Sequence, residues 1–262
     1  AKFQFGIYTG KVDVLVGLPL SFNIAFATVL VPSISKLMAQ KKKEDANKVV
    51  KFSLLATILI GLPCTFGMMV FAEQILKLLY PNAPEGAQLL QITSLTIILM
   101  MMAQTINGVL QGIGKYRVPA TALALGVIAK FVLNLILIPI PSIGINGVAI
   151  GSIVCHIISF SIGFAVLKRA MKIKFDVNKF LIKPLLATAI MCLISYLAYL
   201  LLVQFISWKL SAIVAIILAV PIYALAVAIM KILDKEEIYR LPKGELIYKL
   251  LVKMKLYPSE VQ

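Results

Sequence analysis

Charge is scarce in this chain. Only 14% of its 262 residues are charged, whereas 61% are hydrophobic and the mean hydropathy is +0.98. Soluble domains carry about 25% charged residues, so a water-soluble globule is excluded. The charge is also one-sided, with 26 Lys and Arg against 11 Asp and Glu. In a membrane chain such an excess indicates loops that face anionic cytoplasmic lipid, and we expect no nucleic-acid partner.

The side chains that carry most enzyme chemistry are few and badly placed for it. His156 is the single histidine, and the acidic residues fall in loops or at the ends of apolar segments, with Asp13 nearest to one. No carboxylate pair, Ser-His-Asp set or metal-ligand cluster can be assembled inside those segments. Cys64, Cys155 and Cys192 stand alone in apolar runs, which argues against disulfides and zinc and favours small buried hydrophobes. We therefore predict neither catalysis nor a metal or other cofactor.

Seven apolar segments are each long enough to cross a bilayer as a helix. They cover residues 14–35, 50–72, 88–112, 118–138, 145–167, 184–204 and 210–231. Short turns or basic stretches separate them, which leaves no room for a soluble domain. The sequence thus predicts an all-α, polytopic membrane helix bundle.

Basic residues gather in alternate connections between these segments. Six lie in 36–51, two in 115–117, six in 168–183 and seven after residue 230, whereas the other connections and the N-terminal stretch hold four. Under the positive-inside rule the chain starts outside and ends in the cytoplasm. Most multi-span bacterial carriers start inside. We therefore expect a multi-pass protein of the bacterial cell membrane from which at least one upstream span is missing.

The segments suggest three parts: a five-span lobe (1–168), a final helix pair (169–231) and a cytoplasmic amphipathic tail (232–262). In the tail, one helical face carries Ile247, Leu250, Leu251 and Met254. Glu245 and Lys249 form a favourable i,i+4 pair beside it. This helix either lies on the inner leaflet or packs under the bundle.

Lys130 is the one charged residue deep inside a segment. It lies about twelve residues beyond the cytoplasmic turn, which is about 19 Å into a 30 Å hydrocarbon core. That position costs about 2.5–3.5 kcal/mol, so the amine should face a cavity or a partner. Asn134 follows one turn later on the same face, and Gly126 one turn earlier leaves space. We favour contact with an anionic substrate over a structural hydrogen bond.

Two other segments carry polar residues along one helical face. The first face holds Gln104, Asn107 and Gln111, and the second holds Ser152, His156, Ser159 and Gly163. Because such faces cannot meet lipid cheaply, they point into the bundle, where they either line a water-filled path or join helices. Gly147 and Gly151 have the G-x-x-x-G spacing that permits close helix packing.

Three segments contain an internal proline, at Pro19, Pro63 and Pro221. Each proline frees a carbonyl one turn earlier and bends its helix. Kinked spans with a nearby polar group, here Asn23 beside Pro19, are common in carriers that alternate between inward and outward states. We take the three prolines as candidate hinges. The candidate substrate-binding residues are Lys130, Asn134, Asn23, Gln104, Asn107 and Gln111.

Short motifs along the chain resemble those of a known family. Residues 16–23 (VGLPLSFN) and 29–36 (VLVPSISK) look like one span of the stage V sporulation protein B group. Further motifs follow in the same order: 78–81 (LLYP), 110–115 (LQGIGK) with Pro119, Lys130 with Asn134, 143–149 (IGINGVA) and 234–243 (DKEEIYRLPK). Over essentially its whole length the chain resembles this group, which belongs to the polysaccharide-transporter branch of the multidrug/oligosaccharidyl-lipid/polysaccharide flippases, together with the lipid II flippase.

The resemblance implies about fourteen helices in two lobes plus a final pair, with the seven segments here as the eighth to fourteenth. The implied partners are a missing N-terminal lobe, membrane lipids and an undecaprenyl-pyrophosphate-linked saccharide. Lys130 would border the family's cationic cavity, and the spans within 184–231 would form a groove for the lipid tail. Relatives place several arginines in that cavity, and no segment here contains one.

We therefore expect half of a flippase that moves a lipid-linked peptidoglycan, spore-cortex or polysaccharide precursor by alternating access. One alternative is a drug/cation antiporter of the same superfamily, which normally needs an acidic residue within the spans. Another is a membrane-embedded glycan-processing enzyme, which would need clustered acids, arginines or histidine in the outer loops. Those loops are short and nearly uncharged.

Overall fold

The structure is a computed structural model that describes residues 2–241, 243–254 and 256–257. All the regular elements in these residues are helical. They are α1 Lys2–Ile7, the π-helical turn η1 Tyr8–Val12, α2 Asp13–Ala39, α3 Lys43–Val70, α4 Ala72–Leu79, α5 Ala87–Gly112, α6 Arg117–Leu137, α7 Asn146–Met171, the π-helical turn η2 Asn178–Ile182, α8 Lys183–Leu202, α9 Trp208–Ile229, α10 Lys235–Tyr239 and α11 Gly244–Lys253. Seven helical stretches are long and apolar enough to span a membrane, which confirms the predicted all-α bundle.

The chain divides into two compact units, Ala1–Phe175 and Asp176–Gln262. The first holds α1 to α7, and the second holds α8 to α11. The division falls a little after the boundary predicted at residue 168, and the tail shares a unit with the last two spans. The predicted three functional parts stay a prediction.

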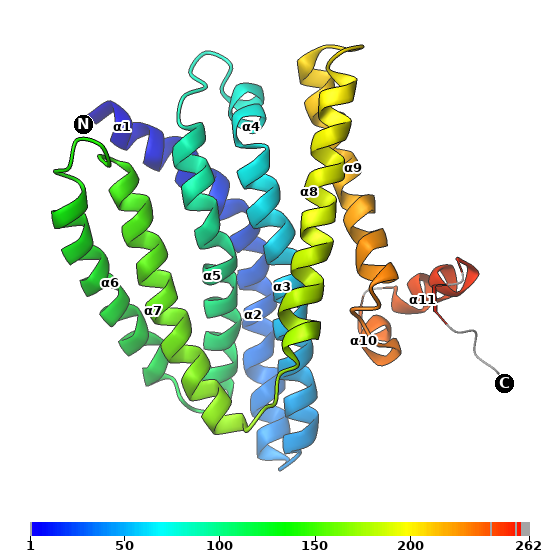
Figure 1. The fold of residues 1–262 in the computed structure, drawn as a ribbon. Coiled ribbons are helices and arrows are strands. Elements are labelled where there is room, and N and C mark those ends of the chain that lie inside the picture. Colours follow the sequence, from blue (N-terminus) through cyan, green and yellow to red (C-terminus); the bar gives the residue numbers. More distant parts are fainter. Residues whose placement is uncertain (1, 242, 255, 258–262) are drawn as a thin grey trace. The chain divides into compact units, whose positions relative to one another are not determined.

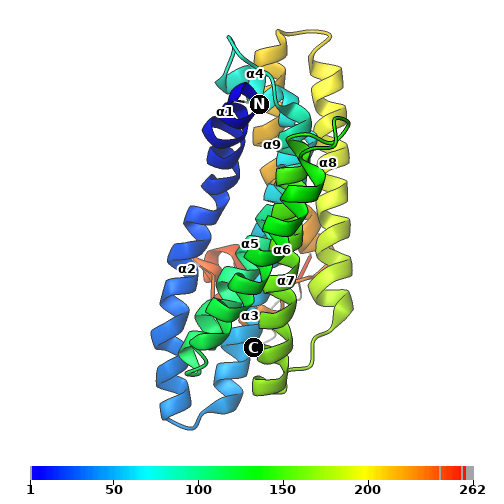
Figure 2. The same cartoon turned by 90° about the vertical axis from the view of Figure 1, so that its left-hand side faces the viewer.

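Helix α5 forms the centre of the first unit. It packs against α2, α3 and α7, and α6 packs mainly on α7 (Figures 1 and 2). Most of α5 is buried, whereas α6 exposes large apolar side chains such as Ile128 and Phe131 along its outer face. Apolar exposure on a membrane helix is favourable in lipid. The helix that carries the predicted amide face is therefore the most buried span of the unit.

Buried hydroxyl groups join α3 to α5 through hydrogen bonds. Thr57 Oγ1 lies 2.8 Å from Thr105 Oγ1 and also donates to the carbonyl of Ser53, one turn earlier. Thr65 Oγ1 accepts a hydrogen bond from the backbone N–H of Ile98. Interhelical hydrogen bonds of this kind stabilise membrane bundles, where helix association gains little from the hydrophobic effect.

The connection between α3 and α5 contains a helix that the sequence analysis did not predict. Helix α4 buries Ala72 and Leu76, and its exposed side carries the ion pair between Glu73 and Lys77. Eight residues are too few to span a membrane, so hydropathy gave no signal for it. After α4, the ammonium of Lys11 donates to the carbonyl of Ala83, which ties this connection to η1.

Candidate substrate-binding site

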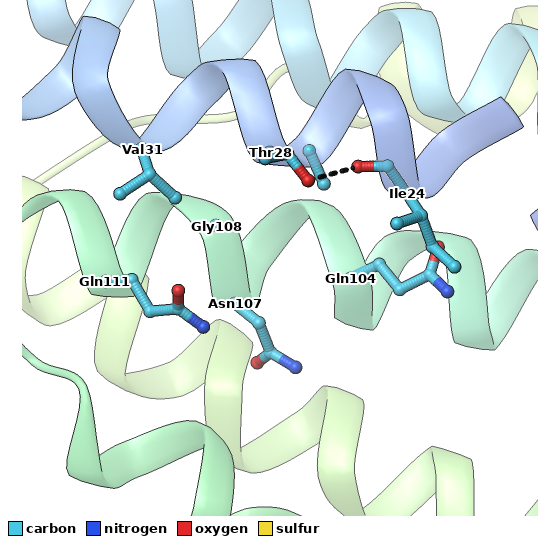
Figure 3. Close-up of a pocket in the computed structure, with 8 residues that line it drawn as sticks. Ile24, Thr28, Val31, Gln104, Asn107, Gly108 and Gln111 are labelled. Atoms are coloured by element: carbon cyan, nitrogen blue, oxygen red, sulfur yellow. Dashed lines mark hydrogen bonds between the residues drawn. The ribbon is translucent and has the colours of Figure 1, made fainter. Parts of the chain in front are cut away.

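A pocket of about 250 Å³ lies between α2 and α5. Three of the predicted residues, Gln104, Asn107 and Gln111, come from successive turns of α5 and line its polar side. The rest of the lining is Ile24, Ala27, Thr28, Val31 and Gly108. Figure 3 shows these lining side chains, Gln104, Asn107 and Gln111 on α5 and Ile24, Thr28 and Val31 on α2. The prediction that these amides share one helical face is confirmed.

Gly108 sets the distance between α2 and α5. A Cβ atom added at Gly108 would lie 2.7 Å from the backbone oxygen of Ala27, closer than real Cβ contacts. The two helices therefore touch through backbone at this point, as small residues allow in membrane proteins. The longer amide side chains beside the contact cannot fit between the helices and project around it.

Asn23 of α2 holds Gln104, the first of the three amide residues along α5. Its side chain is buried, and Nδ2 donates 2.9 Å hydrogen bonds to the carbonyl of Met101 and to Oε1 of Gln104. The amide of Asn23 thus joins α2 to α5 and orients Gln104. Its role in substrate binding stays a prediction, and the structure gives it a helix-joining role beside the pocket.

Asn107 and Gln111 keep their hydrogen-bonding capacity. Neither side chain makes a hydrogen bond within the described part of the chain, and Asn107 is half-buried whereas Gln111 is exposed. An amide group offers two donors and an acceptor. The pocket therefore presents uncharged, bidirectional hydrogen-bonding groups against an apolar wall, which suits a ligand rich in hydroxyl groups.

The remaining two candidates, Lys130 and Asn134, lie at a different helix interface. Both face α7 at Gly151, where an added Cβ would meet Oδ1 of Asn134 and lie 3.4 Å from Cγ of Lys130. Oδ1 of Asn134 is buried and has no hydrogen-bond partner among the described residues. Lys130 is half-buried and forms no ion pair within those residues. The six candidates thus form two groups.

The two groups also lie at different depths. Helices α5 and α6 are joined by a short turn, so the end of α5 and the start of α6 are on the same side of the unit. At 1.5 Å per residue, Asn107 lies about 8 Å from the end of α5, and Lys130 lies about 20 Å from the start of α6. The neutral pocket is therefore near one end of the spans, and the lysine is beyond their middle.

The second predicted polar face, on α7, serves mainly to join helices. Ser152 and Ser159 are buried, and the Ser152 hydroxyl lies 3.4 Å from the hydroxyl of Tyr8. Gly163 faces Ile106 of α5, and Gly147 lies against Leu137 of α6. The close packing predicted from the G-x-x-x-G spacing is confirmed by these contacts.

Among the pocket residues that the sequence did not predict, Thr28 is the polar one. Its hydroxyl donates to the carbonyl of Ile24, 2.8 Å away in the same helix (Figure 3). A threonine that satisfies its own hydroxyl in this way is compatible with lipid as well as with a pocket. No pattern in the sequence distinguishes the two, so only the pairing of α2 with α5 places Thr28 in the pocket.

These features define a class: a multi-pass α-helical membrane protein with a polar pocket between its spans, as carriers have. The chain also matches a family, because the model of the family "Lipid II flippase MurJ" covers residues 11–219, about four-fifths of the chain. The chain belongs to this family of lipid-linked-saccharide flippases.

Three relatives from Bacillus subtilis illustrate the match. The chain is 32% identical to the uncharacterized membrane protein YabM over 152 residues, covering 58% of this chain and 28% of the relative. It is 22% identical to stage V sporulation protein B over 246 residues (92% and 46%). It is 26% identical to the lipid II flippase MurJ over 170 residues (63% and 31%). The chain therefore spans less than half the length of each of these relatives.

Proposed function

We propose that this chain is the C-terminal half of a flippase that moves a lipid-linked saccharide across the bacterial cell membrane. The observation that carries the proposal is the amide-lined pocket between α2 and α5 in a chain of this family. The pocket contains no charged side chain, so it suits the hydroxyl and amide groups of a saccharide. The protein does no chemistry on this substrate; it provides hydrogen bonds along the path.

The positions of the two polar groups suggest an order of contacts. Basic residues flank the end of α5 and the start of α6, so the positive-inside rule assigns that end to the cytoplasm. The amide pocket then lies where a precursor made in the cytoplasm would enter. Lys130 lies deeper and supplies the positive charge that a pyrophosphate needs while it crosses the hydrocarbon core.

A second wall of the path has to come from elsewhere. We infer that an N-terminal lobe, corresponding to the rest of the relatives' length, supplies it together with further cationic side chains. Pro19, Pro63 and Pro221 lie inside the continuous helices α2, α3 and α9, where they remain candidate hinges for rocking between lobes. If the prolines act as hinges, the Pro63→Ala variant should transport more slowly than the parent while binding substrate equally well. Equal transport rates of the variant and the parent would mean that Pro63 is not a hinge.

The test uses the full-length protein reconstituted in liposomes with two fluorescent lipids, undecaprenyl pyrophosphate with and without its saccharide. We expect the parent to move the saccharide-bearing lipid. We expect the double variant Asn107→Leu/Gln111→Leu to lose at least about tenfold of that rate, which is 1.4 kcal/mol of transition-state stabilisation. Gln88→Leu on the exposed start of α5, outside the pocket, is the matched control and should retain the parent's rate.

Two outcomes would contradict the proposal. A parent that moves neither lipid but extrudes a cationic dye down a Na⁺ or H⁺ gradient would be an antiporter. A double variant that transports as fast as the parent, with its fold intact, would mean that the pocket does not contact the substrate. If the double variant loses the same fraction of its transport rate for both lipids, the pocket contacts the pyrophosphate or the lipid tail and not the saccharide.

A further inference from the structure

The segment after the last span is anchored to the start of α8. Lys179, in the π-helical turn before α8, binds Asp234 and lies 2.8 Å from Oε2 of Glu237. Its side chain is only 21% exposed. Asp234 also caps α10, and its backbone N–H donates to Glu237. Because Lys179 precedes α8 and Asp234 follows α9, this cluster holds α10 at the end of the helix pair where α8 begins and α9 ends.

Helix α11 packs on α10 through one face. Gly244 lies against the backbone of Ile238 and Tyr239, with no room for a side chain. Tyr248 is buried, and its ring lies 5.4 Å from that of Tyr239 and 6.1 Å from that of Tyr257.

Tyr257 ties the packed helices α10 and α11 back to the segment that follows α9. Its hydroxyl donates to the carbonyl of Leu233. Burial, and then the charges of Asp234 and Glu237, raise the pKa of Tyr257, so the hydroxyl stays protonated as a donor. Helices α10 and α11 are therefore a fixed attachment to the α8–α9 pair.

The opposite side of α11 leaves a row of apolar side chains uncovered. Leu246, Leu250 and Met254 follow each other on successive turns and are 59%, 60% and 54% exposed. Of the four residues on the predicted apolar face, Leu250 and Met254 are exposed, whereas Ile247 and Leu251 are half-buried.

Basic side chains border this apolar row. Lys249 and Lys253 lie on the adjoining strip of the same exposed side. Glu245 is on the far edge of that strip, paired with Lys249 at 2.7 Å. A row of apolar residues beside lysines is the pattern of helices that lie in the interface of an anionic bilayer.

The orientation of α11 fits that environment. Helix α11 lies across the direction of α8 and α9 (Figure 1), and α10 starts six residues after α9 ends. Since α8 and α9 cross the membrane, a helix that runs across them near their end lies along the membrane surface. Under the positive-inside rule this end faces the cytoplasmic leaflet, which is rich in anionic lipid.

We propose that α11 is an interfacial helix whose Leu246, Leu250 and Met254 enter the lipid layer while Lys249 and Lys253 bind anionic headgroups. The ion-pair cluster of Lys179 positions it there. The partner is an anionic phospholipid surface and not a protein, because the row is narrow and bordered by lysines. This proposal is independent of the substrate that the protein moves.

The test uses the full-length protein without native cysteines, reconstituted in liposomes of phosphatidylcholine and phosphatidylglycerol. An environment-sensitive fluorophore is attached at Leu250→Cys or, as the matched control one and a half turns away, at Glu245→Cys. Lipids brominated near the top of the acyl chain quench fluorophores that enter the interface. We expect at least threefold stronger quenching at position 250 than at 245. We also expect the quenching at position 250 to fall in the double variant Lys249→Ser/Lys253→Ser and in liposomes of pure phosphatidylcholine.

Three results would overturn the proposal. Equal quenching at positions 245 and 250 would mean that the apolar row does not face lipid. No quenching at 250 in any lipid would mean that protein or water covers the row. Energy transfer between fluorophores at position 250 on different copies, without quenching by the brominated lipids, would identify a second copy as the partner. Because position 250 is exposed, the substitution leaves the packing of α10 and α11 intact.

Discussion

The two polar groups of the first unit use glycine in opposite ways. Between α2 and α5, Gly108 meets the backbone of Ala27, and the amides of Asn107 and Gln111 lie outside the contact without a hydrogen bond among the described residues. Between α6 and α7, Gly151 meets the polar side chains themselves, and Oδ1 of Asn134 is covered. The type of a polar residue in a span therefore does not determine its role. What lies opposite it decides whether it lines a pocket or fills an interface.

The largest expected effect is at the backbone contact. Gly108→Ala forces a methyl group to within 2.7 Å of the Ala27 carbonyl oxygen, which cannot rotate away. We expect the free energy of unfolding to fall by about 1–3 kcal/mol, as for overpacking elsewhere. Thermal unfolding of the purified full-length protein in detergent, followed by loss of the monodisperse peak, measures it.

Two matched glycines sharpen this result. At Gly17, on the partner helix α2, an added Cβ meets nothing within 4 Å, so Gly17→Ala should raise stability by about 0.5–1 kcal/mol through helix propensity. Gly151→Ala meets a side-chain amide that can change rotamer, so its cost should stay below about 1.5 kcal/mol. A Gly108→Ala variant as stable as Gly17→Ala would contradict the backbone contact.

Asn23 gives the next effect. Asn23→Leu removes two hydrogen bonds and leaves Oε1 of Gln104 without its donor. We expect a loss of about 1–3 kcal/mol of stability, because a buried donor is removed and a part-buried acceptor is left unpaired. Ser21→Ala, whose exposed hydroxyl donates to the carbonyl of Gly17 in its own helix, is the control and should be neutral. The same thermal unfolding assay measures the stability of both variants. An Asn23→Leu variant as stable as the parent would mean that water replaces the lost donor.

Lys130 tests whether the deeper group acts in transport. Lys130→Met removes the charge and keeps the length of the side chain. We expect transport of the saccharide-bearing lipid to fall about tenfold while stability is unchanged or higher, because a mid-membrane lysine costs about 2.5–3.5 kcal/mol. Lys115→Met, in the exposed turn before α6, controls for loss of a basic residue. Unchanged transport with lower stability would make Lys130 a structural donor.

The sequence predicts the parts of this fold that depend on one helix at a time. Seven spans follow from hydropathy, and the common face of Gln104, Asn107 and Gln111 follows from helical spacing. What depends on pairs of helices could not be predicted. The partner of Asn23 in α5, the place of Thr28 in the pocket and the separate position of Lys130 all need the packing of α2, α5 and α7.

Asn134 gives the smallest effect and the most direct contrast with Asn23. Asn23 is buried and Asn134 is half-buried. Oδ1 of Asn134 is buried and has no partner among the described residues, whereas the amide of Asn23 makes two hydrogen bonds. Replacing an unsatisfied polar group by an apolar one of similar size is nearly neutral or stabilising. Asn134→Leu should therefore change stability by less than about 1 kcal/mol, or raise it. If transport falls while stability holds, Asn134 remains because the substrate needs it. A loss as large as that of Asn23→Leu would instead show that Asn134 holds α6 to α7, and the contrast between the two interfaces would disappear.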